Sequence, residues 1–99
     1  MNLLTVQSKI QANGVADVQA AVEKMLVALD AAQPDGIRYA SCLLPDGETF
    51  LALLQVDDGV DNPLPGLPEY HELLEIVEGS RAEPPVVQSS TVIGSYRLF

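Results

Sequence analysis

Tryptophan is absent from this sequence, and cysteine and histidine each occur once, as Cys42 and His71. A lone cysteine excludes an intrachain disulfide, which is typical of a reducing compartment, so we expect a cytoplasmic protein. The sequence has no apolar run of about 18 residues, and it does not begin with a basic patch followed by an apolar stretch. It therefore predicts a soluble protein with neither a membrane span nor a secretory leader.

Positive charge is also scarce. The chain has five Lys and Arg residues against 14 Asp and Glu residues, which gives a formal net charge of -9. The field of such a chain repels phosphate groups, and no Lys/Arg cluster overrides it locally. We therefore expect neither nucleic acid nor an anionic membrane as a partner. The length of 99 residues predicts a single domain over residues 1–99, of modest stability as a monomer.

The signatures of common enzyme and metal sites are missing too. The sequence has no GxGxxG or Walker loop, no GxSxG elbow and no CxxC pair. Asp57, Asp58 and Asp61 surround Gly59 without the rest of an EF-hand loop, so we interpret them as a solvated turn. Cys42 lies among apolar residues with no adjacent basic side chain, and we expect a buried, inert thiol. No metal site and no catalytic set are predicted.

The hydrophobic pattern divides the chain into six elements. Apolar runs and alternation predict strands at residues 3–12, 37–44, 48–56 and 86–99, and helical spacing predicts helices at residues 16–32 and 68–78. The order β-α-β-β-α-β is the ferredoxin-like arrangement of the α+β class. It predicts a four-stranded antiparallel sheet with both helices on one face.

Local signals support these boundaries. Pro45-Asp46-Gly47, between the second and third strands, suits a type I turn followed by a left-handed glycine. Pro68 suits the first position of the second helix, and Gly79 its end. The chain from residue 37 to residue 56 is therefore expected to be a hairpin.

The strand at residues 48–56 is apolar on both sides. Phe50 and Leu54 belong to one alternation set, whereas Leu51 and Leu53 belong to the other. The helices can cover only one face of the sheet, and a solvated face ought to be polar. The open face is expected to carry Leu51, Leu53, Ile93 and Phe99, together with Leu3. Burying each large apolar side chain is worth roughly 1.5 to 3 kcal/mol, so we predict a homodimer through this face.

The element order, the two-sided sheet and the ending Ile93-Gly94-Ser95-Tyr96-Arg97-Leu98-Phe99 resemble the dimeric α+β barrel superfamily, and within it the small antibiotic-biosynthesis-monooxygenase-like proteins. The resemblance implies two sheets facing each other across a dimer barrel. It also implies a ligand pocket in each subunit, between the helices and the sheet. Members carry out cofactor-free oxygenation, haem degradation or small-molecule rearrangement, and the fold does not choose among these activities.

The residues of the enzymatic members are only partly present. The resemblance implies, for the haem-degrading branch, an Asn on the first strand, a His on the second helix and a Trp, of which only His71 is matched. His71 is also the one side chain that ordinarily titrates near neutral pH, so it is the candidate acid-base residue or haem ligand. We favour the alternative that His71 borders a solvated helix face. No cofactor is predicted, and haem stays open as an alternative.

Two functions remain. We expect a ligand pocket near Tyr39, Tyr70 and His71, although each tyrosine also suits the core or an interface. The favoured prediction is a homodimer that binds a small apolar or aromatic ligand, or another partner, without a catalytic set. The alternative is a cofactor-free monooxygenase-like enzyme that acts on a small aromatic or quinone-like substrate.

Overall fold

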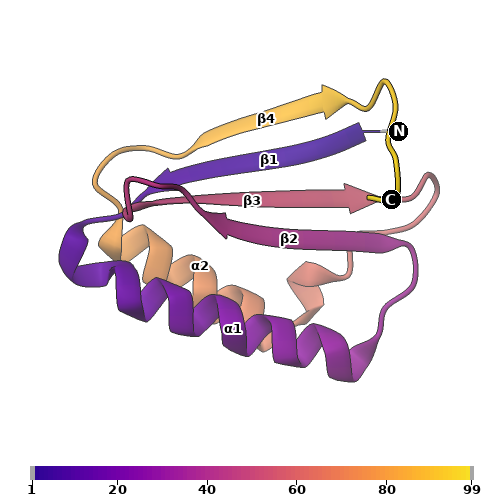
Figure 1. The fold of residues 1–99 in the computed structure, drawn as a ribbon. Helices are drawn as coiled ribbons and strands as arrows, with labels where there is room; N and C mark the ends of the chain where they lie inside the picture. Colours follow the sequence, from indigo (N-terminus) through magenta and orange to yellow (C-terminus); the bar gives the residue numbers. More distant parts are fainter. Residues whose placement is uncertain (1, 99) are drawn as a thin grey trace.

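A computed structural model describes residues 2–98, and it contains the six elements in the predicted order. The strands are β1 (Asn2–Lys9), β2 (Ile37–Leu43), β3 (Thr49–Val56) and β4 (Val86–Thr91). The helices are α1 (Val15–Ala32) and α2 (Pro68–Ser80), and two short 3-10 helices, η1 (Ala12–Gly14) and η2 (Leu64–Gly66), precede them. The ferredoxin-like β-α-β-β-α-β order is confirmed (Figure 1).

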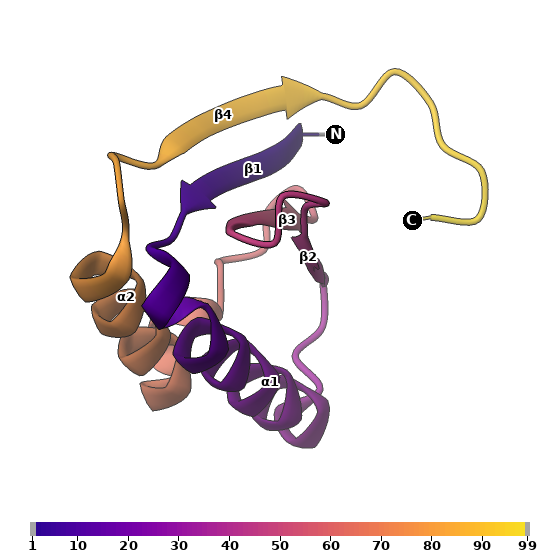
Figure 2. The same cartoon turned by 60° about the vertical axis from the view of Figure 1, so that its left-hand side comes forward.

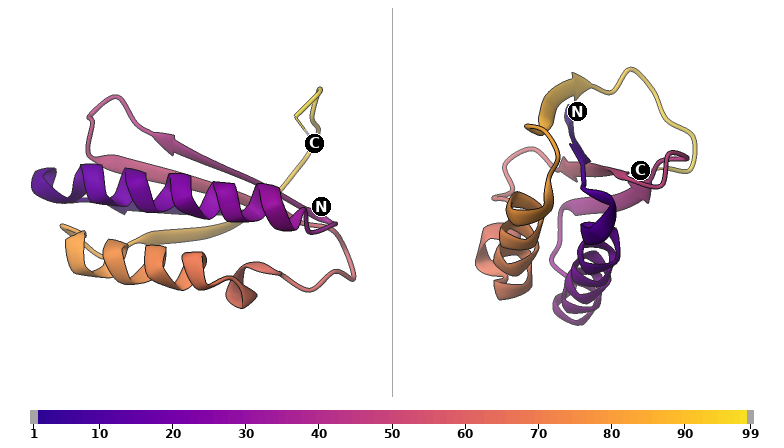
Figure 3. Two further views of the ribbon diagram at one scale, coloured as in Figure 1. Left: turned by 90° about the horizontal axis from the view of Figure 1, so that it is seen from below. Right: turned by 90° about the vertical axis from the view of Figure 1, so that its left-hand side faces the viewer.

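The four strands form one antiparallel sheet in the order β2-β3-β1-β4. Both helices lie side by side against one face of this sheet (Figure 2). Figure 3 shows the same two layers from below and from one end. None of the described helices covers the other face, which we call the open sheet face. No helix among residues 2–98 is both long and apolar enough to cross a membrane.

The core lies between the sheet and the helices. Its buried members are Ile10, Val18, Ala21, Met25, Phe50 and Leu73. Val18 and Met25 are seven residues apart, which is two helical turns, so they share the face of α1 that packs on the sheet. The helix that the apolar spacing predicted over residues 16–32 is confirmed by α1.

The turn between β2 and β3 is closed by Asp46. Its carboxylate accepts hydrogen bonds from the backbone N–H groups of Glu48 and Thr49, both at 2.9 Å, and from the Thr49 hydroxyl. Gly47 has a φ of 72°, in the left-handed region that glycine adopts without strain. The predicted hairpin and its left-handed glycine are confirmed.

The last strand is shorter than predicted. β4 ends at Thr91, not at residue 99, because Thr91 pairs with Asn2 at the beginning of β1 and finds no further neighbour beyond it. Residues 92–98 leave the sheet and swing outward (Figure 2). The tail then returns over the open sheet face, where Leu98 lines a small hollow with Leu3 and Leu53.

Three smaller expectations are wrong. The first strand ends at Lys9, which pairs with the first residue of β3, so the chain turns into η1 instead of continuing to residue 12. Gly79 lies inside α2, which continues to Ser80. Cys42 is exposed because β2 is an edge strand and Cys42 points to the open sheet face.

Candidate functional site

A mostly apolar cavity lies between the helices and the sheet, and we call it the inner cavity. Its volume is about 120 Å³. The lining residues are Leu4, Val6 and Ser8 of β1, Tyr39 and Ser41 of β2, Phe50, Ala52 and Leu54 of β3, Val18 and Val22 of α1, Leu64 of η2, and Tyr70, Leu73, Leu74 and Val77 of α2. None of these side chains is charged, so the cavity suits an uncharged, largely apolar guest.

The inner cavity exists because the middle of the sheet carries small side chains. The strand register sets Ala52 of β3 between Val6 of β1 and Ser41 of β2. Ser8, one alternation step along β1, is also small and is buried. Protein interiors are otherwise packed almost without voids, so a larger residue at position 52 or 41 would fill this space.

Two tyrosines reach the inner cavity from opposite layers. Tyr39 comes from β2 and Tyr70 from α2. Burial raises the pKa of the Tyr39 phenol, the hydrogen bond with Ser41 lowers it, and Tyr70 adds a small further rise. Because the pKa lies above its ordinary value of 10.0, the Tyr39 hydroxyl stays protonated at neutral pH. A protonated phenol is a hydrogen-bond donor.

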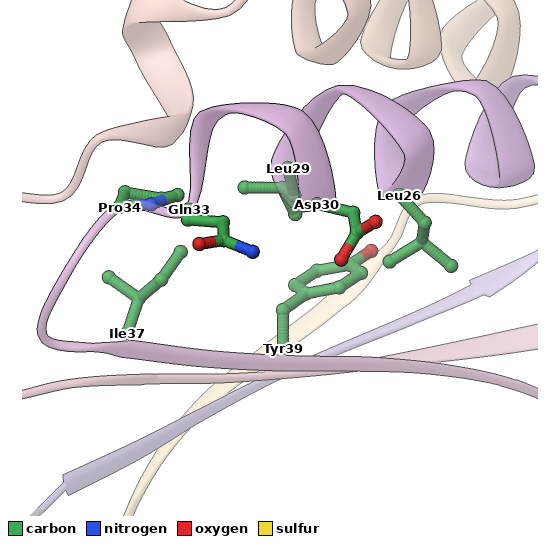
Figure 4. Close-up of a pocket in the computed structure, with 7 residues that line it drawn as sticks. All are labelled: Leu26, Leu29, Asp30, Gln33, Pro34, Ile37 and Tyr39. Atoms are coloured by element: carbon green, nitrogen blue, oxygen red, sulfur yellow. The ribbon is translucent and has the colours of Figure 1, made fainter.

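A second, more open space lies between the C-terminal end of α1 and the beginning of β2, and we call it the α1–β2 groove. Its volume is about 330 Å³, and Tyr39 belongs to its wall as well as to that of the inner cavity. The other lining residues are Leu26, Leu29, Asp30, Gln33, Pro34 and Ile37. Figure 4 shows the Asp30 carboxylate of α1, and the amide of Gln33 just beyond the end of α1, pointing toward the Tyr39 side of the groove. The groove thus combines apolar walls with one carboxylate.

The open sheet face carries leucines that are only partly buried. Leu53 lies between Thr5 of β1 and Ala40 of β2 in the strand register, and Leu51 and Leu3 occupy the same face. Each therefore leaves apolar surface in contact with solvent, as predicted for Leu51 and Leu53. Two further residues, Ile93 and Phe99, were predicted for the interface. Ile93 lies beyond β4 and is fully exposed, and Phe99 lies outside the described residues.

No protein-family model matches this sequence, and no curated protein matches it significantly. Solved structures do match. Rv0793 from Mycobacterium tuberculosis has a TM-score of 0.74 at 15% identity, with 95% of this chain and 96% of that chain covered. A crystal structure of an antibiotic biosynthesis monooxygenase has a TM-score of 0.75 at 13% identity, with 95% of this chain and 100% of that chain covered. This chain has the antibiotic biosynthesis monooxygenase-like fold.

A third similar structure is the NE2512 protein of unknown function from Nitrosomonas europaea, with a TM-score of 0.72 at 12% identity, covering 96% of this chain and 91% of that chain. The predicted resemblance to the antibiotic biosynthesis monooxygenase-like proteins is thus confirmed for the fold. Identities this low carry no activity from one chain to another, because one fold serves many functions.

Within this monooxygenase-like fold, His71 lies outside the inner cavity. It is exposed, and its Nε2 lies 2.7 Å from the carbonyl oxygen of Pro65. A carbonyl can only accept, so Nε2 carries the hydrogen and donates it. The His71 ring also meets Tyr70 edge-on, with the ring centroids 6.0 Å apart. The structure therefore brings Tyr39 and Tyr70 together at the cavity, and His71 is not among the residues that line it.

Some residues of the site were missed from the sequence. Ser8, Ser41 and Ala52 create the space in the inner cavity, and Asp30 and Gln33 line the α1–β2 groove. The signal for the first three is a small residue on the helix-facing side of three different strands, and it becomes visible only once the strand register is known. Among residues 2–98, no three His, Cys, Asp or Glu side chains gather closely enough to hold a metal ion.

Proposed function

We propose that this protein is a homodimer whose inner cavity binds a small apolar or aromatic ligand of about one ring. The observation that carries the proposal is the uncharged, mostly apolar cavity with two tyrosines, Tyr39 and Tyr70, in its wall. Such a site holds an apolar ring by contact with its walls, and it orients an acceptor group on that ring by one hydrogen bond.

The size of the inner cavity limits the ligand. Drug-sized ligands occupy pockets of roughly 300 Å³ or more, whereas an apolar cavity of about 150 Å³ in another protein stays dry and binds benzene. At about 120 Å³, the inner cavity is slightly smaller than that one, so it suits a ligand of about one ring. A haem macrocycle is much larger, and the Nε2 of His71 is already bound to Pro65, so we propose a function without haem.

The homodimer is proposed through the open sheet face. Leu3, Leu51 and Leu53 lie there only partly buried, and in the superfamily that the chain resembles two such sheets face each other. A partner would remove these leucines from water, which stabilises the assembly. An exposed free thiol at Cys42 agrees with a reducing compartment, and the cytoplasm remains the proposed location.

The ligand proposal is tested by filling the inner cavity. Ala52→Leu places a larger side chain in the middle of the cavity, and Ala31→Leu makes the same change on the exposed side of α1. We expect phenol, anisole and toluene to raise the thermal midpoint of the wild type and of Ala31→Leu, but not of Ala52→Leu. Circular dichroism checks that Ala52→Leu is folded. Equal responses of all three proteins would contradict the proposal, as would no response of the wild type.

The alternative function is a cofactor-free monooxygenase-like activity on a small aromatic or quinone-like substrate. Its support is the name of one similar structure, an antibiotic biosynthesis monooxygenase, together with the Tyr39 phenol in the cavity wall. An oxygen electrode tests it with small hydroquinones. Oxygen uptake that depends on the protein and falls in Ala52→Leu would favour this enzyme, and ligand binding without uptake would favour the binding protein.

A further inference from the structure

The α1–β2 groove differs from the inner cavity in its electrostatics. Asp30 brings a carboxylate to the groove, and no Lys or Arg is among its lining residues. Asp30 makes no ion pair among residues 2–98, where the two ion pairs join Lys24 to Glu72 and Arg38 to Asp57. The negative charge at this end of α1 is therefore not neutralised from within the described part of the chain.

The end of α1 adds to this negative field. The carbonyl of Asp30 would ordinarily accept a hydrogen bond from the N–H of residue 34, but residue 34 is a proline and has none. The described backbone offers no other N–H to this carbonyl or to those of Ala31 and Ala32. α1 also has no basic residue in its last turn, so nothing there offsets the negative end of the helix dipole.

Apolar walls flank this negative end. Leu29 and Ile37 lie on opposite sides of the groove, one on the helix and one on the strand, and Leu26 extends the apolar surface along α1 (Figure 4). A metal ion such as Ca²⁺ or Mg²⁺ needs six or more oxygen ligands, and contact with apolar walls does not stabilise it. An organic cation gains from both the walls and the charge.

We propose that the α1–β2 groove binds the ammonium group of a small apolar amine. The ammonium lies against the Asp30 carboxylate, where it can also donate to the Gln33 side-chain oxygen, and the hydrocarbon part packs on Leu29 and Ile37. The formal net charge of -9 raises the local concentration of such a cation and repels carboxylates. This site is separate from the inner cavity and does not require a ligand there, although Tyr39 lines both.

Two-dimensional amide NMR tests the proposal with cyclohexylamine, and with cyclohexanol as the neutral probe of the same shape. We expect cyclohexylamine to shift the amide signals of residues 26–39, and cyclohexanol to do so about tenfold more weakly, because its neutral hydroxyl can donate to the Asp30 carboxylate but lacks the attraction between opposite charges. The shifts should be smaller at high salt. Equal affinity for the two probes, or shifts that avoid the groove, would overturn the proposal.

Substitutions supply the second half of the test. Asp30→Asn should weaken cyclohexylamine binding about tenfold, and Asp30→Glu should restore most of it. Asp35→Asn is the matched control, because Asp35 is an exposed acid five residues away that does not line the groove. If Asp35→Asn weakened binding as much as Asp30→Asn, the attraction would be nonspecific and the proposal wrong. Ala52→Leu, which fills the inner cavity, should leave cyclohexylamine binding unchanged. The proposals for the two sites can therefore be contradicted independently of each other.

Discussion

Asp46 is a surface residue that organises the whole β2–β3 connection. The hydrogen bond from the Thr49 hydroxyl is the largest cause that lowers the pKa of its carboxyl below the ordinary value of 3.8, and the backbone N–H groups of Glu48 and Thr49 add to it. A folded-state pKa below the unfolded one means that the ionised carboxylate stabilises the fold. This contribution is complete above the unfolded pKa and is lost as the pH falls through the folded pKa.

We therefore predict that Asp46→Ala lowers the thermal midpoint by a few degrees at pH 7, because the two N–H groups and the Thr49 hydroxyl lose their acceptor. The difference from the wild type should shrink as the pH falls below about 4 and should nearly vanish below the folded pKa of Asp46. Thermal unfolding followed by circular dichroism from pH 2 to 7 measures it. Asp58→Ala, in an exposed loop, should show no such pH-dependent difference; a constant difference for Asp46→Ala down to pH 2 would argue against the carboxylate's role.

Between elements, a close approach joins the entrance of α1 to the end of α2. A Cβ on Gly14 would lie 2.8 Å from the Cβ and 2.9 Å from the Oγ of Ser80. These distances are shorter than van der Waals contact, so only glycine allows η1 and α2 to meet here. The backbone hydrogen bond from Gln11 to the Ser80 carbonyl, at 2.8 Å, fastens the same junction.

Gly14→Ala should therefore destabilise the protein by about 1 to 3 kcal/mol, the usual range for overpacking. Ser80→Gly removes the opposing side chain, so the double variant should recover part of that loss, and a double-mutant cycle should give a favourable coupling. Urea unfolding measures all four proteins. The control is Gly66→Ala, since nothing lies within 4 Å of a Cβ there. A purely additive double variant would show that the two residues do not clash.

The elements that the sequence predicted well are those set by nearby residues. α1 follows from apolar spacing within 18 residues, and the hairpin follows from the Pro-Asp-Gly turn. The end of β4, the exposure of Cys42 and the inner cavity depend instead on which strands are neighbours. β4 stops where β1 begins, and Ala52 faces small or moderate partners across two strands. Such pairings join residues far apart in the sequence, and one sequence does not reveal them.

At the scale of the whole molecule, the helices supply a cover for only one face of the sheet. Leu53 lies in the middle of the other face, half-buried between Thr5 and Ala40. In a symmetric dimer a substitution acts twice, so a charge at this position would be buried on both sides of the interface. The open sheet face is therefore where the proposed assembly would be most easily broken without disturbing the core.

We predict that Leu53→Glu reduces the dimer affinity by more than tenfold and yields a folded monomer at micromolar concentration. Sedimentation velocity measures assembly, and circular dichroism checks the fold. Val27→Glu makes a comparable change on the solvent side of α1, where Val27 is 71% exposed, and should leave the dimer intact. A wild type that is monomeric at tens of micromolar, or a Leu53→Glu variant that remains dimeric, would contradict the proposed interface.

Cys42 offers a probe of the same face that needs no substitution. It is exposed in the single chain and is paired in register with Leu51, at the β2 edge of the open sheet face. If a partner sheet covers this face, the thiol becomes protected, so its reaction rate with a chromogenic disulfide reagent should fall as the protein concentration rises through the dimer dissociation constant. Leu53→Glu should react at the fast rate at every concentration. The wild type could instead react as fast as Leu53→Glu at concentrations where sedimentation finds a dimer. That result would mean that the two sheets meet without covering the β2 edge.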